Sequence, residues 1–365
     1  MAASHQQDPV ALCDLYELVR DCRPAIPGSI AHTGHSFIVE GALILHLSNP
    51  DRNKDYSPDA PHGAQVWRVP LDEGPAQQLA TLQKFHYVTH VAKGQLFAQV
   101  PSSYPSYALT GDQDGTIYDL SGNAIGTYPI ARRRTDGGMR QLHSVAAMDG
   151  DTVLGYAVDW VPGADGVVGK EAIEYRMLAR AERDSGTIDE VFSLDHSYDD
   201  MRRFGLHGGY AYGQFTGVLG TVEDARGSRH YLGAFLDNSW LAVASMDETG
   251  KPDALIRKLS WIDDVSCAGG FVYAMNANRL VVADMFAGTR LTEEFTGRLR
   301  PEMENRGTAG CLHAAMAASP EGTLVLAYRD SPTDSIHFDR LTPVRDARAY
   351  LAEHGKPHGA LAHVR

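Results

Sequence analysis

The sequence lacks the features that mark membrane, disulfide-stapled and nucleotide-binding proteins. Its apolar runs fall short of the roughly 18 residues that a membrane span needs, and its first residues lack the basic start and apolar core of a signal peptide. It has 4 cysteines in 365 residues, none of them in a CxxC pair, which argues against a disulfide framework. Walker, GxGxxG, HExxH and GxSxG motifs are absent. We therefore expect a cytoplasmic protein with no membrane partner and no nucleotide cofactor.

Basic residues are also in short supply. The chain has 33 Lys and Arg against 46 Asp and Glu, a formal net charge of −13. Nucleic acids bind proteins chiefly through lysine and arginine that replace the counterions of the phosphates. This balance predicts that no nucleic acid is a partner.

What the chain does contain is an internal repeat. A polar residue, often His, leads into a run of small residues, which is followed by a turn with Gly or Asp and then by an apolar strand. The pattern returns after about 50 to 60 residues, close to the period of propeller blades. The six copies are Ala31 to Leu47, Phe85 to Val100, Leu142 to Val158, Arg202 to Phe215, Asp263 to Asn276 and Leu312 to Tyr328.

A second hairpin pattern follows the first five copies, with alternating apolar residues on both sides of a turn. The turns contain the Gly, Asn and Asp residues that favour positive φ angles. They are LDEG (71–74), LSGN (120–123), RDSG (183–186), DETGK (247–251) and FAG (286–288). Each repeat is therefore predicted to form four antiparallel strands.

Four-stranded repeats of this length predict an all-β fold, a single β-propeller domain, in preference to a sandwich or β-helix. We expect six blades, with five or seven as alternatives. The last blade lacks a convincing fourth strand, which residues 11–22 would supply from the N-terminus; their apolar spacing fits a short helix equally well. The predicted blades span residues 31–82, 85–130, 140–194, 202–259, 262–297 and 310–341 of the single domain 1–365.

The repeat predicts a site at one mouth of the central channel, because the first residues of the inner strands converge there. Long loops on the same face, such as residues 48–63 and 101–115, favour a ligand or a partner. Four of the six heads are histidines, and the others carry arginine or aspartate. The candidate site residues are His32, His86, His143, His313, Arg203 and Asp264.

Converging imidazoles are ligands that Fe, Mn, Zn or Cu select, so His32, His86, His143 and His313 are predicted metal ligands. In an enzyme, His86, His143 and His313 would also transfer protons, Arg203 would bind an anionic group of the substrate, and Asp264 would act as a base or orient a histidine. The alternative for Arg203 and Asp264 is a structural ion pair at the channel mouth.

The chain resembles β-propellers as an architecture, through the six copies given above. The placement of its four histidines is similar to that in metal-dependent lyases and carotenoid-cleaving oxygenases. This resemblance implies a lyase, hydrolase or oxygenase acting on a small organic substrate with an anionic or aromatic group. Two alternatives stay open: a metal-free cyclase or isomerase, and a protein-binding propeller with structural histidines.

Overall fold

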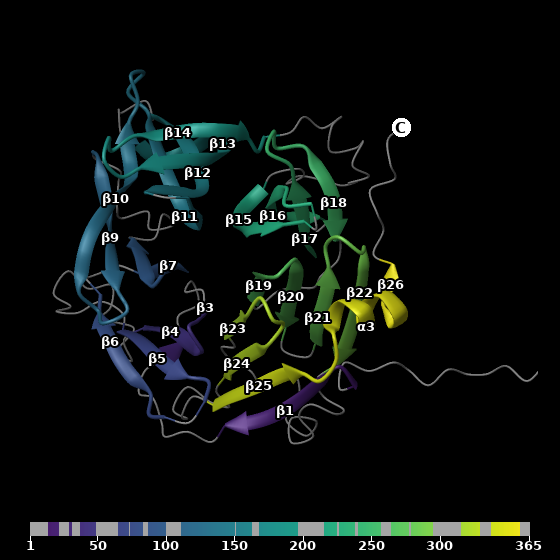
Figure 1. Ribbon diagram of the computed structural model, residues 1–365. Helices are drawn as coiled ribbons and strands as arrows, with labels where there is room; N and C mark the ends of the chain where they lie inside the picture. The colour runs from purple at the N-terminus through teal and green to yellow at the C-terminus, as the bar shows by residue number, and fades with distance from the viewer. Residues whose placement is uncertain are drawn as a thin grey trace, which may run out of the picture.

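The computed structural model consists mainly of β-strands arranged in a ring (Figure 1). It describes residues 14–21, 29–30, 37–48, 65–72, 74–82, 87–99, 111–149, 151–162, 168–195, 215–224, 226–237, 240–256, 264–276, 279–294, 315–328 and 337–357. None of the helices in these ranges is long and apolar enough to span a membrane.

The strands follow one another in four-stranded groups, and all neighbouring strands in the sheets pair antiparallel. Group one contains β3 (Phe37–Val39), β4 (Ala42–Ser48), β5 (Gln65–Pro70) and β6 (Gln77–Thr81), with β2 (Ser29–Ile30) also paired to β4. Group two contains β7 (Tyr87–Ala92), β8 (Gln95–Gln99), β9 (Gln113–Asp119) and β10 (Ala124–Arg133). Group three contains β11 (Met139–Asp149), β12 (Thr152–Pro162), β13 (Val168–Glu182) and β14 (Ile188–Ser193).

The second half of the chain continues the pattern. Group four contains β15 (Phe215–Glu223), β16 (Arg229–Asp237), β17 (Trp240–Met246) and β18 (Pro252–Ile256). Group five contains β19 (Asp264–Ala268), β20 (Phe271–Asn276), β21 (Arg279–Asp284) and β22 (Thr289–Glu294). Group six contains β23 (Ala315–Ala318), β24 (Leu324–Tyr328), β25 (His337–Pro343) and, from the other end of the chain, β1 (Tyr16–Asp21).

The number of separate sheets differs from the predicted number of blades. The described strands form five sheets, of four, eight, four, five and five strands, and not six or seven. Groups two and three are joined into the eight-stranded sheet, because Ala131, Arg132 and Arg133 of β10 pair with Gln141, Arg140 and Met139 of β11. The short turn between them contains Gly137 at φ +86°, so the two strands form a hairpin across the junction.

The five predicted hairpin turns are confirmed. Gly74, Gly122, Gly186, Gly250 and Gly288 all have positive φ, between +68° and +151°. This is the region that glycine adopts without the steric cost that a Cβ brings. The turns fix the strand register that places alternate residues in the core.

Within residues 11–22, for which the sequence fits a strand and a helix equally well, the structure has a strand, β1 (Tyr16–Asp21). β1 pairs with β25 from Tyr16↔Pro343 to Asp21↔Phe338, and Figure 1 shows the purple N-terminal strand beside the yellow C-terminal one. The two ends of the chain therefore share one sheet.

A closed ring of inner strands surrounds the centre of the molecule. β3, β7, β11, β15, β19 and β23 each contact the next in this order, and β23 contacts β3. Between each pair of neighbouring groups lies a cluster of buried apolar side chains. The core is thus distributed around the ring as face-to-face packing between sheets, which is the arrangement of a β-propeller.

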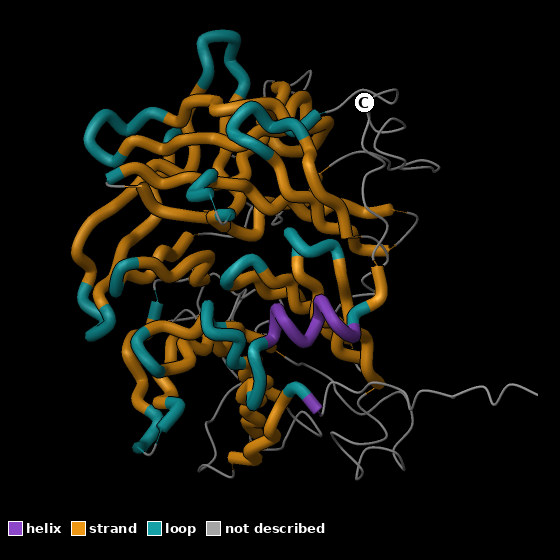
Figure 2. The backbone as a smooth tube through the Cα atoms, turned by 45° about the vertical axis from the view of Figure 1, so that its right-hand side comes forward, coloured by secondary structure: helices purple, strands orange, loops and turns teal. Residues whose placement is uncertain are grey.

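Residues 347–357 cover the outer edge of group five. After β25 the chain forms α3 (Ala347–His354), seen in purple in Figure 2, and β26 (Lys356–Pro357), which pairs with β22. Arg348 of α3 forms an ion pair of 2.9 Å with Asp284, whose side chain is fully buried. This segment covers part of a sheet edge whose backbone groups would otherwise be open to pairing with other chains.

Candidate functional site

A cavity of about 430 Å³ lies among the inner strands and is lined by all six of them. This volume is within the usual range for small-molecule sites. Most of the lining comes from the middle and the end of each inner strand, and some from the turns that follow. The lining residues are 37–39, 89–93, 144–148, 218–221, 265–269, 318 and 320.

Irregular pairing of the inner strands shapes this cavity. The register of β7 with β8 skips Thr89, that of β11 with β12 skips His143 and Ala146, and that of β15 with β16 skips Leu219. Such bulges add a residue to one strand and bend it. Opposite the second β11 bulge stands Gly155, where a Cβ would come within 2.0 Å of the Ser144 carbonyl oxygen. Only glycine allows this close approach.

The polar groups along the cavity are few. Thr89, Ser144, Thr221 and Ser266 supply hydroxyls, and two of these are held by the backbone. Thr89 Oγ1 donates to the Phe97 carbonyl oxygen at 3.3 Å, and Ser266 Oγ accepts from the Ala318 backbone N–H at 3.2 Å. The rest of the lining is largely aliphatic, so the cavity combines apolar walls with a small number of fixed hydrogen-bonding groups.

His90 and Lys93 are the basic residues of the lining. The His90 ring meets the Phe37 ring edge-on at 5.7 Å between centroids, and the Phe97 ring lies 6.3 Å away on another side. These aromatic contacts hold the imidazole beside the cavity. Lys93 is exposed and lies in the turn after β7. No Asp or Glu belongs to the lining that the described residues form.

Lys93 has an unusual backbone conformation. Its φ is +50°, followed by Gly94 at +70°, and the equivalent turn of group one has Glu40 at +49° and Gly41 at +67°. Positive φ at both central residues is typical of a type I′ turn, which usually takes Asn or Gly first. Lys93, in the cavity lining, and Glu40, in the equivalent turn of group one, therefore both adopt a backbone conformation that is strained for a side chain with a Cβ.

Cys267 lines the cavity but has the chemistry of an inert thiol. It is a free cysteine, and burial raises its pKa to about 12. The thiolate is the nucleophilic and metal-binding form of cysteine. At neutral pH this side chain therefore contributes a neutral, polarisable surface and not a nucleophile.

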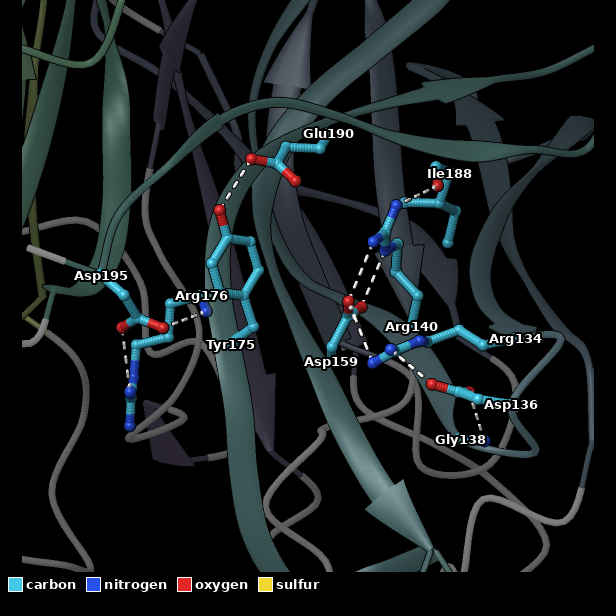
Figure 3. Close-up of polar contacts among 10 residues, drawn as sticks. All are labelled: Arg134, Asp136, Gly138, Arg140, Asp159, Tyr175, Arg176, Ile188, Glu190 and Asp195. Carbon is cyan, nitrogen blue, oxygen red and sulfur yellow. Dashed lines mark hydrogen bonds and ion pairs between the residues drawn. The ribbon is translucent and has the colours of Figure 1, made fainter.

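A separate group of ion pairs fixes group three (Figure 3). Arg140 donates two hydrogen bonds, of 2.7 and 2.9 Å, to Asp159, its direct partner across β11 and β12. Arg134 reaches the same carboxylate at 3.2 Å, and Asp136 at 2.6 Å. Arg140 also donates to the Ile188 carbonyl oxygen at 3.2 Å. These contacts tie the hairpin between β10 and β11 to the outer strands, which is a structural role.

His143 is the one predicted histidine within the described residues. Its ring stacks on Trp160 at 5.8 Å and meets Tyr156 edge-on at 5.7 Å. Burial, together with the charge of Arg176, lowers its pKa to about 4. The cavity lining begins at the next residue, Ser144, and does not include His143.

Of the other predicted site residues, only the backbone of Asp264 is described. Asp264 is the first residue of β19, and the lining of that strand begins at Val265. His32, His86, Arg203 and His313 lie outside the described residues. The roles of all these residues, and the Fe, Mn, Zn or Cu site, stay predictions. Among the described residues, no group of three or more His, Cys, Asp or Glu is arranged to hold a metal ion.

The sequence pattern singled out the heads of the inner strands, whereas the cavity includes their later residues. Lys93 was missed, although it stands in a Lys-Gly pair between two alternating runs, where the first position of a tight turn usually takes Asn or Gly. His90 stands four residues after His86, the predicted first residue of its repeat. The register of β7 with β8 shifts at Thr89, just before His90.

No protein-family model matches the sequence, and no curated protein matches it. Among solved structures, the α-L-arabinanase of Penicillium chrysogenum in complex with arabinobiose has 11% identity and a TM-score of 0.46, covering 89% of this chain and 97% of that one. The α-L-arabinofuranosidase Arb93A from Fusarium graminearum has 9% identity and a TM-score of 0.44, covering 90% and 98%. The AfRom2 CNH domain has 7% identity and a TM-score of 0.41, covering 89% and 98%.

Proposed function

We propose that this protein is an enzyme that binds a small organic molecule in the axial cavity. The single observation that carries the proposal is the cavity itself, a volume of about 430 Å³ into which all six inner strands contribute. Ligand sites in proteins are typically concave, mainly apolar and furnished with a few fixed polar groups. The hydroxyls of Ser144 and Thr221, the imidazole of His90 and the Lys93 ammonium are such groups.

In the proposed enzyme, His90 is the residue that transfers protons to or from the substrate. Imidazole is a common proton-transfer group in enzymes, and the Phe37 and Phe97 rings hold this one beside the cavity. The chemistry that fits is a proton-shifting reaction such as isomerisation, cyclisation or elimination. Glycoside hydrolysis fits less well, because it needs a pair of carboxylates and the described lining includes none.

We further propose that the ring has six blades, one for each four-stranded group. This treats the eight-stranded sheet as two blades joined by the three residue pairs between β10 and β11. The apolar cluster between groups two and three supports it, since buried side chains of β8–β10 pack there against buried side chains of β11–β14. A crystal structure in which these strands form one continuous flat sheet, without face-to-face packing, would overturn the count.

Filling the cavity tests the proposed function. A Cβ added at Gly220 would meet no atom closer than the Ala146 carbonyl oxygen at 3.9 Å, and its φ is not positive. Gly220→Leu therefore places a side chain at the cavity without a backbone clash. Gly111→Leu is the matched control, because a Cβ there meets nothing within 4 Å and Gly111 is not part of the lining.

The binding probe is N-phenyl-1-naphthylamine, an uncharged molecule that fluoresces in apolar surroundings. We expect one equivalent of this probe to bind the wild type and Gly111→Leu. Its affinity for Gly220→Leu should be at least about tenfold weaker. For the catalytic part, each protein is incubated with a mixed metabolite extract, and consumption is followed by mass spectrometry. A metabolite lost with wild type but not with Gly220→Leu or His90→Gln supports the enzyme. Equal probe binding by Gly220→Leu and wild type overturns the site.

A further inference from the structure

We infer that the ligand of the axial cavity is an amphiphilic organic anion, with its carboxylate or similar head group at Lys93 and its apolar body along the aliphatic walls. This inference rests on the proposed function and adds the chemical class of the ligand to it.

The charges of the lining carry the inference. Lys93 is the one lysine or arginine of the described lining, and no carboxylate accompanies it there. The whole chain has an excess of acidic residues and a net charge of −13, so a described lining without Asp or Glu differs from the average composition of the molecule. A charge taken out of water needs an opposite charge or fixed hydrogen bonds. The described lining supplies a positive charge to an anion, and none of its residues supplies a carboxylate to a cation.

The walls fit an apolar body. Val39, Val91, Val145, Val218, Leu219 and Val265 line the cavity, one or two from each of five inner strands. Aliphatic walls stabilise a ligand in proportion to the apolar surface that it removes from water. A fully polar ligand, such as a sugar, would leave most of its hydroxyls unpaired against these side chains.

The position of Lys93 fits a head group at the rim. Lys93 is exposed and follows the end of β7, so the ammonium can meet a head group that keeps part of its hydration. Its φ of +50° is a strained conformation that Asn or Gly would relieve. Such outliers often accompany functional sites. Glu40 lies in the equivalent turn of the neighbouring group, and its Oε1 is 3.8 Å from the point where a Cβ on Gly94, the residue after Lys93, would lie. The negative charge of Glu40 therefore reduces the attraction of Lys93 for an anion.

Three probes with the same eight-carbon chain test the class: octanoate, 1-octanol and octylamine at pH 7.5, by isothermal titration calorimetry. We expect octanoate to bind at least about tenfold more tightly than the octylammonium ion, since one hydrogen bond to a charged group is worth about that much. Decanoate should bind about 15-fold more tightly than octanoate, since each of its two extra methylenes adds about fourfold when buried.

The variants separate the inference from the proposed function. Lys93→Asn removes the charge and suits the positive φ; it should weaken octanoate about tenfold and leave 1-octanol unchanged. Lys251→Asn, at an exposed turn outside the lining, is the matched control and should bind as wild type. Glu40→Gln should bind octanoate more tightly. If 1-octanol or octylamine binds as well as octanoate, or if Lys93→Asn has no effect, the anion inference is wrong while the cavity site stands. If none of the chains binds and N-phenyl-1-naphthylamine also fails, the proposed function is wrong.

Discussion

The side chain of Gln99 in β8 holds the backbone of His143 in β11, through a hydrogen bond of 2.6 Å from Nε2 to the His143 carbonyl oxygen. The same amide nitrogen donates to the Leu142 carbonyl oxygen at 3.1 Å, and Tyr128 donates its hydroxyl to the Gln99 side-chain oxygen at 3.0 Å. The two carbonyls stand at a bulge, where the regular strand ladder is interrupted. Gln99, which is 1% exposed, thus joins groups two and three at a point where β11 bends.

Gln99→Leu should therefore destabilise the protein although the volume hardly changes. It leaves two carbonyl oxygens and a phenol hydroxyl without this partner, and each unsatisfied buried group costs about 1 to 3 kcal/mol. We expect a loss of about 3 kcal/mol in the free energy of unfolding, measured by urea denaturation. Gln78→Leu is the control, because the Gln78 side chain is exposed and donates to Thr81 Oγ1 in the same strand. A loss in Gln99→Leu no larger than in Gln78→Leu would contradict the bracing role.

Asp159→Ala should show how much the ion pairs of group three contribute. The Asp159 side chain is 5% exposed and binds Arg140 and Arg134, whose side chains are 22% and 26% exposed. Removing one partner of a buried pair costs about 3 to 5 kcal/mol, and the partial exposure of both guanidinium groups reduces this. We expect a loss of about 2 to 3 kcal/mol by urea denaturation. Asp136→Ala, at an exposed partner of Arg134, should cost less than about 1 kcal/mol, and equal losses would argue against a buried network.

Lys93→Gly should stabilise the fold. The left-handed region costs a residue with a Cβ about 1 to 2 kcal/mol, and the extra flexibility of glycine in the unfolded chain gives back about 0.5 to 1 kcal/mol. The expected gain is about 0.5 to 1 kcal/mol, measured as a higher urea midpoint. Lys251→Gly, at a lysine without a positive φ, should lower the midpoint instead. If both variants lower it, the strain at Lys93 is absent.

Stability should fall in mild acid because of buried histidine. His46 is buried in β4, and burial lowers its pKa from 6.5 to about 4. His46 of the unfolded chain therefore binds a proton below about pH 6.5, whereas His46 of the folded protein binds one only below about pH 4. The full stability is present above pH 6.5, and part of it is lost as the pH falls from 6.5 to 4. The loss for this one group is up to about 3 kcal/mol.

The test compares urea unfolding of wild type and His46→Gln at pH 7.0, 5.5 and 4.5. The substitution changes the stability at neutral pH by its own amount, so the informative quantity is the slope with pH. We expect a shallower decline in His46→Gln, since one titrating group is removed. Parallel declines in the two proteins would mean that His46 is protonated in the folded state as readily as in the unfolded chain.

The sequence by itself determined the repeat and the local structure within it. Apolar alternation and the glycines of LSGN, DETGK and the other turns are local signals, and steric limits on φ act within a few residues. The strands, their antiparallel order and the propeller architecture followed from them. Whether residues 11–22 form a helix or a strand stayed open, because periodicity alone cannot show a partner more than 300 residues away in β25.

Only the tertiary structure decided which residues meet at the axis. A bulge adds a residue to a strand and changes which face its later side chains occupy. The inner strands have such register shifts at Thr89, His143 and Leu219, and at His143 the backbone is bound by Gln99 of the neighbouring group. His143 therefore packs on Trp160, while the cavity passes to later residues of the inner strands. The sequence sets which residues share a strand, and the packing between sheets sets where each of them points.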